Sequence, residues 1–432
     1  MDSSFRIDGN LIFFEFLQDK DDVERIKELK FKMADIEPYV KIDQNLNPGK
    51  INNDLIALSI IMMVNPFVGN NLYFDFSVSK RFIQIVEKVI SRYKITCKDF
   101  DNIPLKAERG SKPGLAFSGG ADSSAALSIM PKDVSLVFMN RPMEKKSVYD
   151  SSAPLEICRR LEEIGFDVEV IETNLEYLRE PVGFPTDLAN SIPAILHSEY
   201  LDLDSIAFGT VLESGYGIGH EHYIDYSKGA HYRFFSTLFN SVGLELSLPT
   251  LGISEVGTAI IGNKAPGGIL QQSCIRGKLF EPCFRCWKCF RKELLNYSLG
   301  FVESPPNFEE MMRSNEIQQR LSAYPISHEN VITYSLQRIN FNDIKNLKVL
   351  SSKLDMNKKL GFLEEWYPPS IEFVPDKYRF TIREKIIKYL SVMRLRDQNL
   401  ITNWQMDEHL KSSKTKLGQE KLLKLWDDIN HK

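Results

Sequence analysis

A glycine-rich segment with hydroxyl and carboxylate side chains directly follows a short apolar run; it reads Ser118-Gly119-Gly120-Ala121-Asp122-Ser123-Ser124. Glycines permit backbone angles that other residues avoid, so the amides of such a loop can point together at an anion. A helix that starts after the loop adds its N-terminal amides and its dipole. The pattern predicts a polyphosphate cradle. The alternative is an ordinary serine-glycine turn in which Asp122 caps the helix.

Four of the six cysteines form a second candidate site; they are Cys274, Cys283, Cys286 and Cys289, in the order C-x8-C-x2-C-x2-C. Four thiolates are enough for a closed tetrahedral zinc site. The basic residues around them would lower the thiol pKa values and offset the negative charge of that site. An iron-sulfur cluster and a redox pair in the tandem Cys-x-x-Cys segments are the alternatives. The two isolated cysteines are interpreted as structural.

Other polar residues each allow two interpretations. The run His220-Glu221-His222, with Asp225 and His231 nearby, could bind a metal or supply a base, or it could be a solvated loop. Lys278 could contact an α-phosphate or serve as a countercharge to the thiolates. The amphipathic tail from Leu417 to Ile429 is expected to dock on the body of the protein, with partner binding as the alternative.

The glycine-rich loop matches neither the G-x-x-x-x-G-K-[ST] P-loop nor the G-x-G-x-x-G fingerprint. It resembles the PP-loop of the N-type ATP pyrophosphatases, which binds the pyrophosphate end of ATP while AMP is transferred and pyrophosphate leaves with magnesium. The resemblance implies ATP and Mg2+ as ligands, with Asp122 and Ser123 as catalytic residues. The ATP-binding residues that it implies are Ser118, Gly119, Gly120, Asp122, Ser123 and Ser124.

Taken together, the loop and the cysteines resemble 7-cyano-7-deazaguanine synthase and its relatives over about residues 112–297. Those enzymes adenylate a carboxylate with ATP, let ammonia displace AMP, and repeat the activation to make a nitrile. The resemblance implies a small-molecule carboxylate and ammonia as partners and Zn2+ at the cysteines. The segments 208–216 and 248–251 are weaker matches. The family's glycine-arginine-asparagine stretch is replaced here by residues 184–190, which leaves the acceptor open.

The elements that must position these residues alternate between strands and helices. Short apolar strands at 115–117, 135–139, 168–171 and 206–209 alternate with helical patterns at 123–130, 150–165 and 186–203. This alternation predicts an α/β class with a mainly parallel sheet and helices on both faces. Ligands of such sheets bind at the carboxyl ends of the strands, where the glycine loop begins. The resemblance implies the Rossmann-like fold of the adenine nucleotide alpha hydrolases.

The chain is long enough for several domains. We expect a small N-terminal α/β domain over residues 1–110, with residues 101–113 as a linker, and the ATP pyrophosphatase domain with its four-cysteine zinc site over residues 111–300. Residues 301–432 carry charged helical patterns, such as 382–395 and 416–429, and are predicted to be mostly helical. The terminal additions exceed a minimal synthase, as in relatives from phage-defence and modification gene clusters, and a protein partner could bind there.

The composition limits the partners. The net charge of -4 gives no reason to expect the broad basic surface that nucleic-acid binding requires. The densest apolar run, residues 56–64, is too short to span a bilayer, and the N-terminus lacks the order of a signal peptide. A cytoplasmic location is therefore expected. Two rival functions stay open: a nucleotide-binding regulatory or scaffold subunit without turnover, and an RNA thiolation enzyme.

Overall fold

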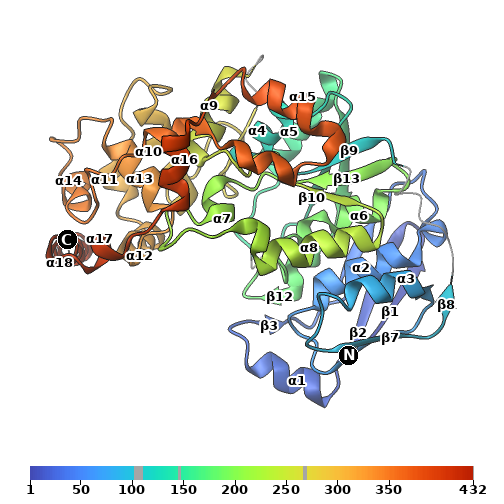
Figure 1. Cartoon of the computed structure of the whole chain (residues 1–432). Helices are drawn as coiled ribbons and strands as arrows, with labels where there is room; N and C mark the ends of the chain where they lie inside the picture. The colour runs from blue at the N-terminus through green and yellow to red at the C-terminus, as the bar shows by residue number, and fades with distance from the viewer. Residues whose placement is uncertain (102–109, 145–146, 266–269, 432) are drawn as a thin grey trace. The chain divides into compact units, whose positions relative to one another are not determined.

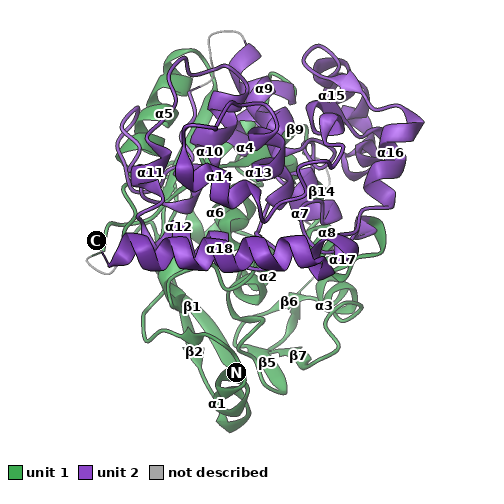
Figure 2. Cartoon of the chain, turned by 90° about the vertical axis from the view of Figure 1, so that its left-hand side faces the viewer, with its two compact units in different colours: residues 1–118, 131–208, 227–247 green, residues 119–130, 209–226, 248–432 purple. Residues whose placement is uncertain are grey.

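The computed structural model of the chain describes residues 1–101, 110–144, 147–265 and 270–431 (Figure 1). These residues form two compact units, each assembled from three segments of the chain (Figure 2). Unit 1 comprises Met1–Ser118, Pro131–Phe208 and Ser227–Ser247, and unit 2 comprises Gly119–Met130, Gly209–Tyr226 and Leu248–Lys432.

The predicted linker, domain boundaries and absence of a membrane span can be compared with the structure only in part. The predicted linker, residues 101–113, falls largely on residues 102–109, which lie outside the described part of the chain. The expected boundaries after residues 110 and 300 stay predictions. Within the described ranges, no helix combines the length and the apolar character that crossing a bilayer requires.

A five-stranded parallel sheet forms the centre of unit 1. Its strands are β9 (Lys112–Phe117), β10 (Ser135–Asn140), β11 (Asp167–Glu172), β13 (Leu203–Ala207) and β14 (Glu245–Ser247), in the spatial order β11-β10-β9-β13-β14. The first strand of the sheet is thus central, the next two lie on one side of it, and the last two lie on the other. This arrangement confirms the α/β class and the parallel sheet.

Helices of unit 1 lie between successive strands of this sheet in the chain. They are α5 (Ser152–Glu163), α6 (Ile192–His197) and α8 (Ala230–Ser241). Figure 1 shows α5 on one side of the strands and α6 and α8 on the other. The helix expected over 186–203 was too long. It starts only at Ile192, where Pro193 occupies the first turn, and the left-handed backbone at Asp202 (φ 56°) follows its end.

The N-terminal part of unit 1 has its own mixed sheet, with the order β4-β2-β1-β5-β7. Its strands are β1 (Asp2–Asp8), β2 (Leu11–Leu17), β4 (Tyr39–Lys41), β5 (Asn71–Phe74) and β7 (Lys94–Cys97), accompanied by helices α1 (Lys20–Lys27), α2 (Asn53–Val64) and α3 (Lys80–Val86). Short strands form two further pairs: β3 (Lys32–Met33) with β12 (Arg179–Glu180), and β6 (Val78–Ser79) with β8 (Phe100–Asp101). Helix α2 is apolar all round and almost completely buried, as expected for a helix inside a core.

Helices dominate unit 2. They are α4 (Ala121–Ile129), α7 (Leu212–Tyr216), α9 (Glu255–Lys264), α10 (Trp287–Ser298), α11 (Phe308–Met311), α12 (Asn315–Ser322), α13 (Glu329–Leu336), α14 (Lys345–Ser351), α15 (Asp376–Ile386), α16 (Leu395–Thr402), α17 (Asp407–Lys411) and α18 (Ser413–Asn430). The prediction of a mostly helical C-terminal region is confirmed. A continuous helix over 382–395 is wrong, because β16 (Ser391–Val392) pairs with β15 (Glu365–Trp366) and this tertiary pairing overrides helical propensity.

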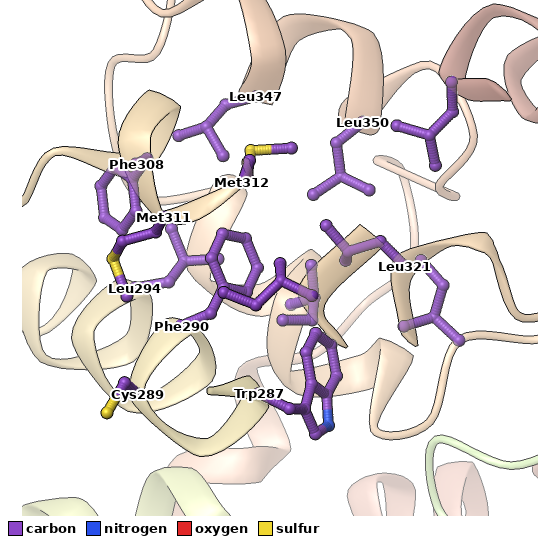
Figure 3. Packing of buried hydrophobic residues seen from close by; sticks show 14 of the residues in the cluster. Trp287, Cys289, Phe290, Leu294, Phe308, Met311, Met312, Leu321, Leu347 and Leu350 are labelled. Carbon is purple, nitrogen blue, oxygen red and sulfur yellow. The ribbon is translucent and has the colours of Figure 1, made fainter. Parts of the chain in front are cut away.

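The apolar core of unit 2 fixes the position of α10. Phe290 and Leu294 on this helix pack among Phe308 of α11, Leu350 of α14 and other buried side chains (Figure 3). Trp287 stacks on Phe290 with ring centroids 5.9 Å apart. Burial of each such side chain contributes about 1.5–3 kcal/mol, so rotation or displacement of α10 would cost several such contributions. The apolar core therefore also fixes the positions from which the polar side chains of α10 extend.

Candidate functional site

The glycine loop joins β9, which ends at Phe117, to α4, which begins at Ala121. Gly119 has a left-handed backbone (φ 71°), and Gly120 is the N-cap residue without a side-chain cap. The segment that leads into the cysteines fixes this turn: the N–H of Gln272 donates to the carbonyl of Gly119 (2.8 Å). The N–H of Ala121 donates to Oγ of Ser273 (3.3 Å). The loop is therefore a constrained turn at a helix N-terminus.

Gly209 brings a second backbone segment against the loop. A Cβ atom at this position would lie 2.7 Å from the carbonyl carbon of Asp122 and from the backbone nitrogen of Ser123. Real Cβ atoms do not approach backbone atoms so closely, so a larger residue would have to displace one of the two segments. The glycine in the segment 208–210 is thus required by close packing on the loop.

Asp122 and the two serines after it have different surroundings. The Asp122 carboxylate, one-third exposed, accepts a hydrogen bond from Oγ1 of Thr258 (2.8 Å) and lies 3.5 Å from Nζ of Lys292. Oγ of Ser123 donates to the Gly120 carbonyl (3.1 Å). Ser124 is buried, and its Oγ has no hydrogen-bond partner among the described residues. The structure therefore brings Asp122 together with two residues that are distant in the sequence.

Glu255 is the centre of a buried ionic cluster at the start of α9. Its carboxylate, 2% exposed, lies 2.8 Å from Arg291, 3.3 Å from Lys292 and 2.8 Å from Nδ1 of His328. Burial alone would raise the pKa of this carboxyl. The charges of Lys292 and Arg291 and the contact with His328 outweigh burial and hold the pKa well below its usual value. Glu255 is therefore a buried negative charge.

Glu213 on α7 is a second buried carboxyl group beside the first. It accepts hydrogen bonds from the N–H of Glu255 (3.1 Å) and from Nδ2 of Asn330 (2.9 Å). Burial, reinforced by the negative charge of Glu255, raises its pKa to about 8. At neutral pH Glu213 is thus mostly protonated.

Lys292 links the ionic cluster to the loop. Its ammonium lies between the carboxylates of Asp122 and Glu255, and the side chain is 13% exposed. Burial lowers the pKa of this ammonium, but the two carboxylates more than compensate and raise it. Lys292 and Arg291 follow the cysteines on α10, so the support of that helix also positions the two cations. The arrangement can present a positive charge next to the glycine loop.

Sequence patterns alone did not indicate Glu255 or Thr258, and they predicted Lys292 only as one of the basic countercharges to the thiolates. In the structure, Arg276 pairs with Glu316 (2.8 Å), while Arg291 and Lys292 pair with Glu255. The sequence did contain two helical signals: Ser254 caps α9 immediately before Glu255, and Arg291 and Lys292 follow the last cysteine within one helical turn.

The four cysteines come together as predicted, and their Sγ atoms all lie within 4.8 Å of one another. Cys286 is the N-cap residue of α10 and Cys289 lies in its first turn, with their Sγ atoms 3.4 Å apart. A tetrahedral zinc site with Zn–S distances of about 2.3 Å has sulfurs about 3.8 Å apart. The Sγ atoms of Cys283 and Cys289 are 3.8 Å apart. The donor set and its spacing suit a tetrahedral metal ion.

The other candidate residues do not join this site. His220, Glu221 and His222 line an open groove of about 500 Å³ together with Arg320 and apolar side chains. His231 pairs with Asp187 (3.3 Å). The metal-ligating side chains that the described residues bring together in a group of three or more are those of the cysteines. Lys278 lies in the turn before Glu281 and is exposed.

Comparison with known proteins finds a match to a family model over part of the chain. The model of a family of unknown function, DUF6395, matches residues 234–405. This range contains the cysteines, Glu255, Lys292 and His328, but it does not contain the glycine loop. Neither the curated proteins nor the solved structures yielded a match to the chain.

Proposed function

We propose that the protein is a PP-loop ATP pyrophosphatase that activates a carboxylate as an acyl-adenylate. The observation that carries this proposal is the constrained glycine loop at the N-terminus of α4, with Asp122 held between Thr258 and Lys292. The strand order supports a Rossmann-like assignment, because β9 is central, with β10 on one side of it and β13 on the other. Ligands of such sheets bind at the point where the strand order reverses.

In this proposal the loop amides and the dipole of α4 bind the pyrophosphate end of ATP. Asp122 has a partly exposed carboxylate, the type of ligand that Mg2+ prefers, so it would hold the ion, which would neutralise charge on the leaving pyrophosphate. Ser118, Gly119, Gly120, Ser123 and Ser124 form the cradle. Thr258 orients Asp122 through its hydroxyl.

The reaction consists of two displacements. A carboxylate oxygen of the substrate attacks the α-phosphorus, and the bond from that phosphorus to the bridging oxygen of pyrophosphate breaks. Ammonia then attacks the acyl carbon, AMP leaves, and a proton is released to give the amide. The contribution of the protein is to position the groups and to stabilise the developing charge. By resemblance, the acceptor is a deazaguanine carboxylate or a similar heterocycle.

We propose zinc as the ion at the cysteine cluster, because four thiolates with tetrahedral spacing favour it. Cys286 and Cys289 belong to the start of α10, so the ion would fix the end of the helix that carries Arg291 and Lys292. Such a site requires reduced thiols, which favours a cytoplasmic location.

Labelled substrate tests the proposed reaction. The protein would be incubated with ATP, Mg2+, ammonia and 7-carboxy-7-deazaguanine labelled with oxygen-18 in the carboxylate. We expect AMP that carries one labelled oxygen, together with pyrophosphate, because the carboxylate oxygen stays with the phosphorus when AMP leaves. ADP as the sole nucleotide product would contradict the proposal. ATP binding without turnover of any carboxylate would favour the regulatory subunit instead.

Elemental analysis tests the metal separately. We expect close to one equivalent of zinc per chain, and its loss in the Cys289→Ser variant, because three thiolates hold the ion less tightly. An exposed-surface variant, Lys424→Ala, serves as the control for metal content. A purified protein that contains neither zinc nor iron would contradict the metal assignment.

A further inference from the structure

Lys292 lies close to two carboxylates without a short contact to either. Its Nζ atom lies 3.5 Å from Asp122 and 3.3 Å from Glu255, and these distances are longer than that of a strong charge-assisted hydrogen bond. The same atom is buried and has no hydrogen-bond acceptor within bonding geometry among the described residues. The ammonium is thus held mainly by the charges of the two carboxylates rather than by short hydrogen bonds to them.

We propose that Lys292 is a phosphate-binding residue, which gives up Asp122 for a non-bridging phosphate oxygen when Mg2+ and nucleotide reach the loop. This inference rests on the proposed function. It adds a side chain from α10 to the cradle that the sequence predicted at residues 118–124.

The balance of charge supports this exchange. Asp122 and Glu255 are the two carboxylates of the cluster, and Lys292 and Arg291 are opposite them, while Glu213 stays mostly protonated. The charge of Lys288 also acts on Asp122. A divalent cation on Asp122 would weaken the attraction between Asp122 and Lys292. Glu255 already has Arg291 and His328 close by. The ammonium would then be in excess, and a phosphate oxygen next to the loop is the group that can balance it.

The surroundings of Lys292 also make it a better phosphate ligand than Lys278. Lys292 stands on α10, which the apolar core fixes, and its ammonium also lies 3.3 Å from the Glu255 carboxylate. Lys278 is exposed in a turn, and the structure records no ion pair between it and the described residues of the loop. A preorganised cation loses little freedom when the anion binds, which favours binding.

Calorimetric binding of α,β-methylene-ATP with Mg2+ tests this inference, because the analogue cannot be cleaved at the reacting bond. We expect Lys292→Ala to weaken binding about 10- to 100-fold, as expected for loss of a charged hydrogen bond. Lys292→Arg should retain most of the affinity. Adenosine, which has no phosphate, should bind the wild type and Lys292→Ala within about twofold of each other.

Two controls separate the possible failures. Lys424→Ala removes the same charge from an exposed position on α18 and should bind the analogue like the wild type. Lys292→Gln keeps much of the side-chain volume if Lys292→Ala unfolds, and its melting temperature is measured alongside. Equal affinity of wild type and folded Lys292 variants would overturn the role of Lys292 and leave the proposed function standing. Absence of analogue binding by the wild type would overturn both.

Discussion

Glu255 and Glu213 are both buried, yet they carry different charges. Glu255 contacts Arg291, Lys292 and His328, which keep it ionised, whereas Glu213 accepts its hydrogen bonds from an amide side chain and a backbone N–H. Neighbouring charges therefore decide the protonation state in addition to burial: Glu255 lies beside Lys292 and Arg291, whereas Glu213 lies beside the negative charge of Glu255. Of the two carboxyl groups, Glu255 alone is therefore charged, and it pairs with Arg291 and Lys292 of α10.

Removal of the charged carboxylate should have the largest effect. Glu255→Gln leaves Arg291 and Lys292 buried without their shared anion, which costs about 3–5 kcal/mol of unfolding free energy. Glu213→Gln is the matched control, because Glu213 is already neutral; it should cost only about 1 kcal/mol. Urea unfolding at neutral pH measures both. Equal destabilisation by the two variants would show that the carboxyl groups do not differ in charge.

The pH dependence of stability should follow the neutral carboxyl. The pKa of Glu213 rises from an ordinary 4.5 to about 8 on folding, so the folded state binds more protons between these values. The protonation of Glu213 therefore contributes a few kcal/mol to the free energy of unfolding. This contribution is fully present below about pH 4.5 and is lost as the pH rises to about 8. Unfolding free energies of wild type and Glu213→Gln from about pH 5 to about pH 9 measure this. Parallel curves for the two proteins would refute the assignment.

Removal of one cation should raise the pKa of Glu255 toward that of Glu213 and destabilise its charged form. Arg291→Met keeps an apolar side chain in place but leaves Lys292 and His328 as the partners of Glu255. We expect a loss of about 1–3 kcal/mol, smaller than for Glu255→Gln because the carboxylate keeps two neighbours. Denaturant unfolding measures the loss of stability in Arg291→Met. The control is Arg313→Met, the same substitution at an exposed arginine. A loss as large as that of Glu255→Gln would mean that Arg291 alone carries the pairing.

The local parts of the site could be predicted from the sequence, and the long-range contacts could not. The glycine loop and the cysteine spacing specify short turns, and the structure contains both. The alternation of apolar strands and helical patterns predicted the parallel sheet, although helix ends at 186–203 and 382–395 were wrong where a proline and a strand pair intervened. Glu255 and Lys292 meet Asp122 only through tertiary packing, which no local pattern records.

We propose that Asp122 and its loop direct the cleavage of ATP between the α- and β-phosphates. The most direct measurement follows the products of ATP with Mg2+, a carboxylate acceptor and ammonia, using the wild type and Asp122→Ala. We predict AMP and pyrophosphate in equal amounts from the wild type, and a rate at least about 100-fold lower for a folded Asp122→Ala protein. Release of ADP and phosphate, or an unchanged rate for Asp122→Ala, would contradict the account.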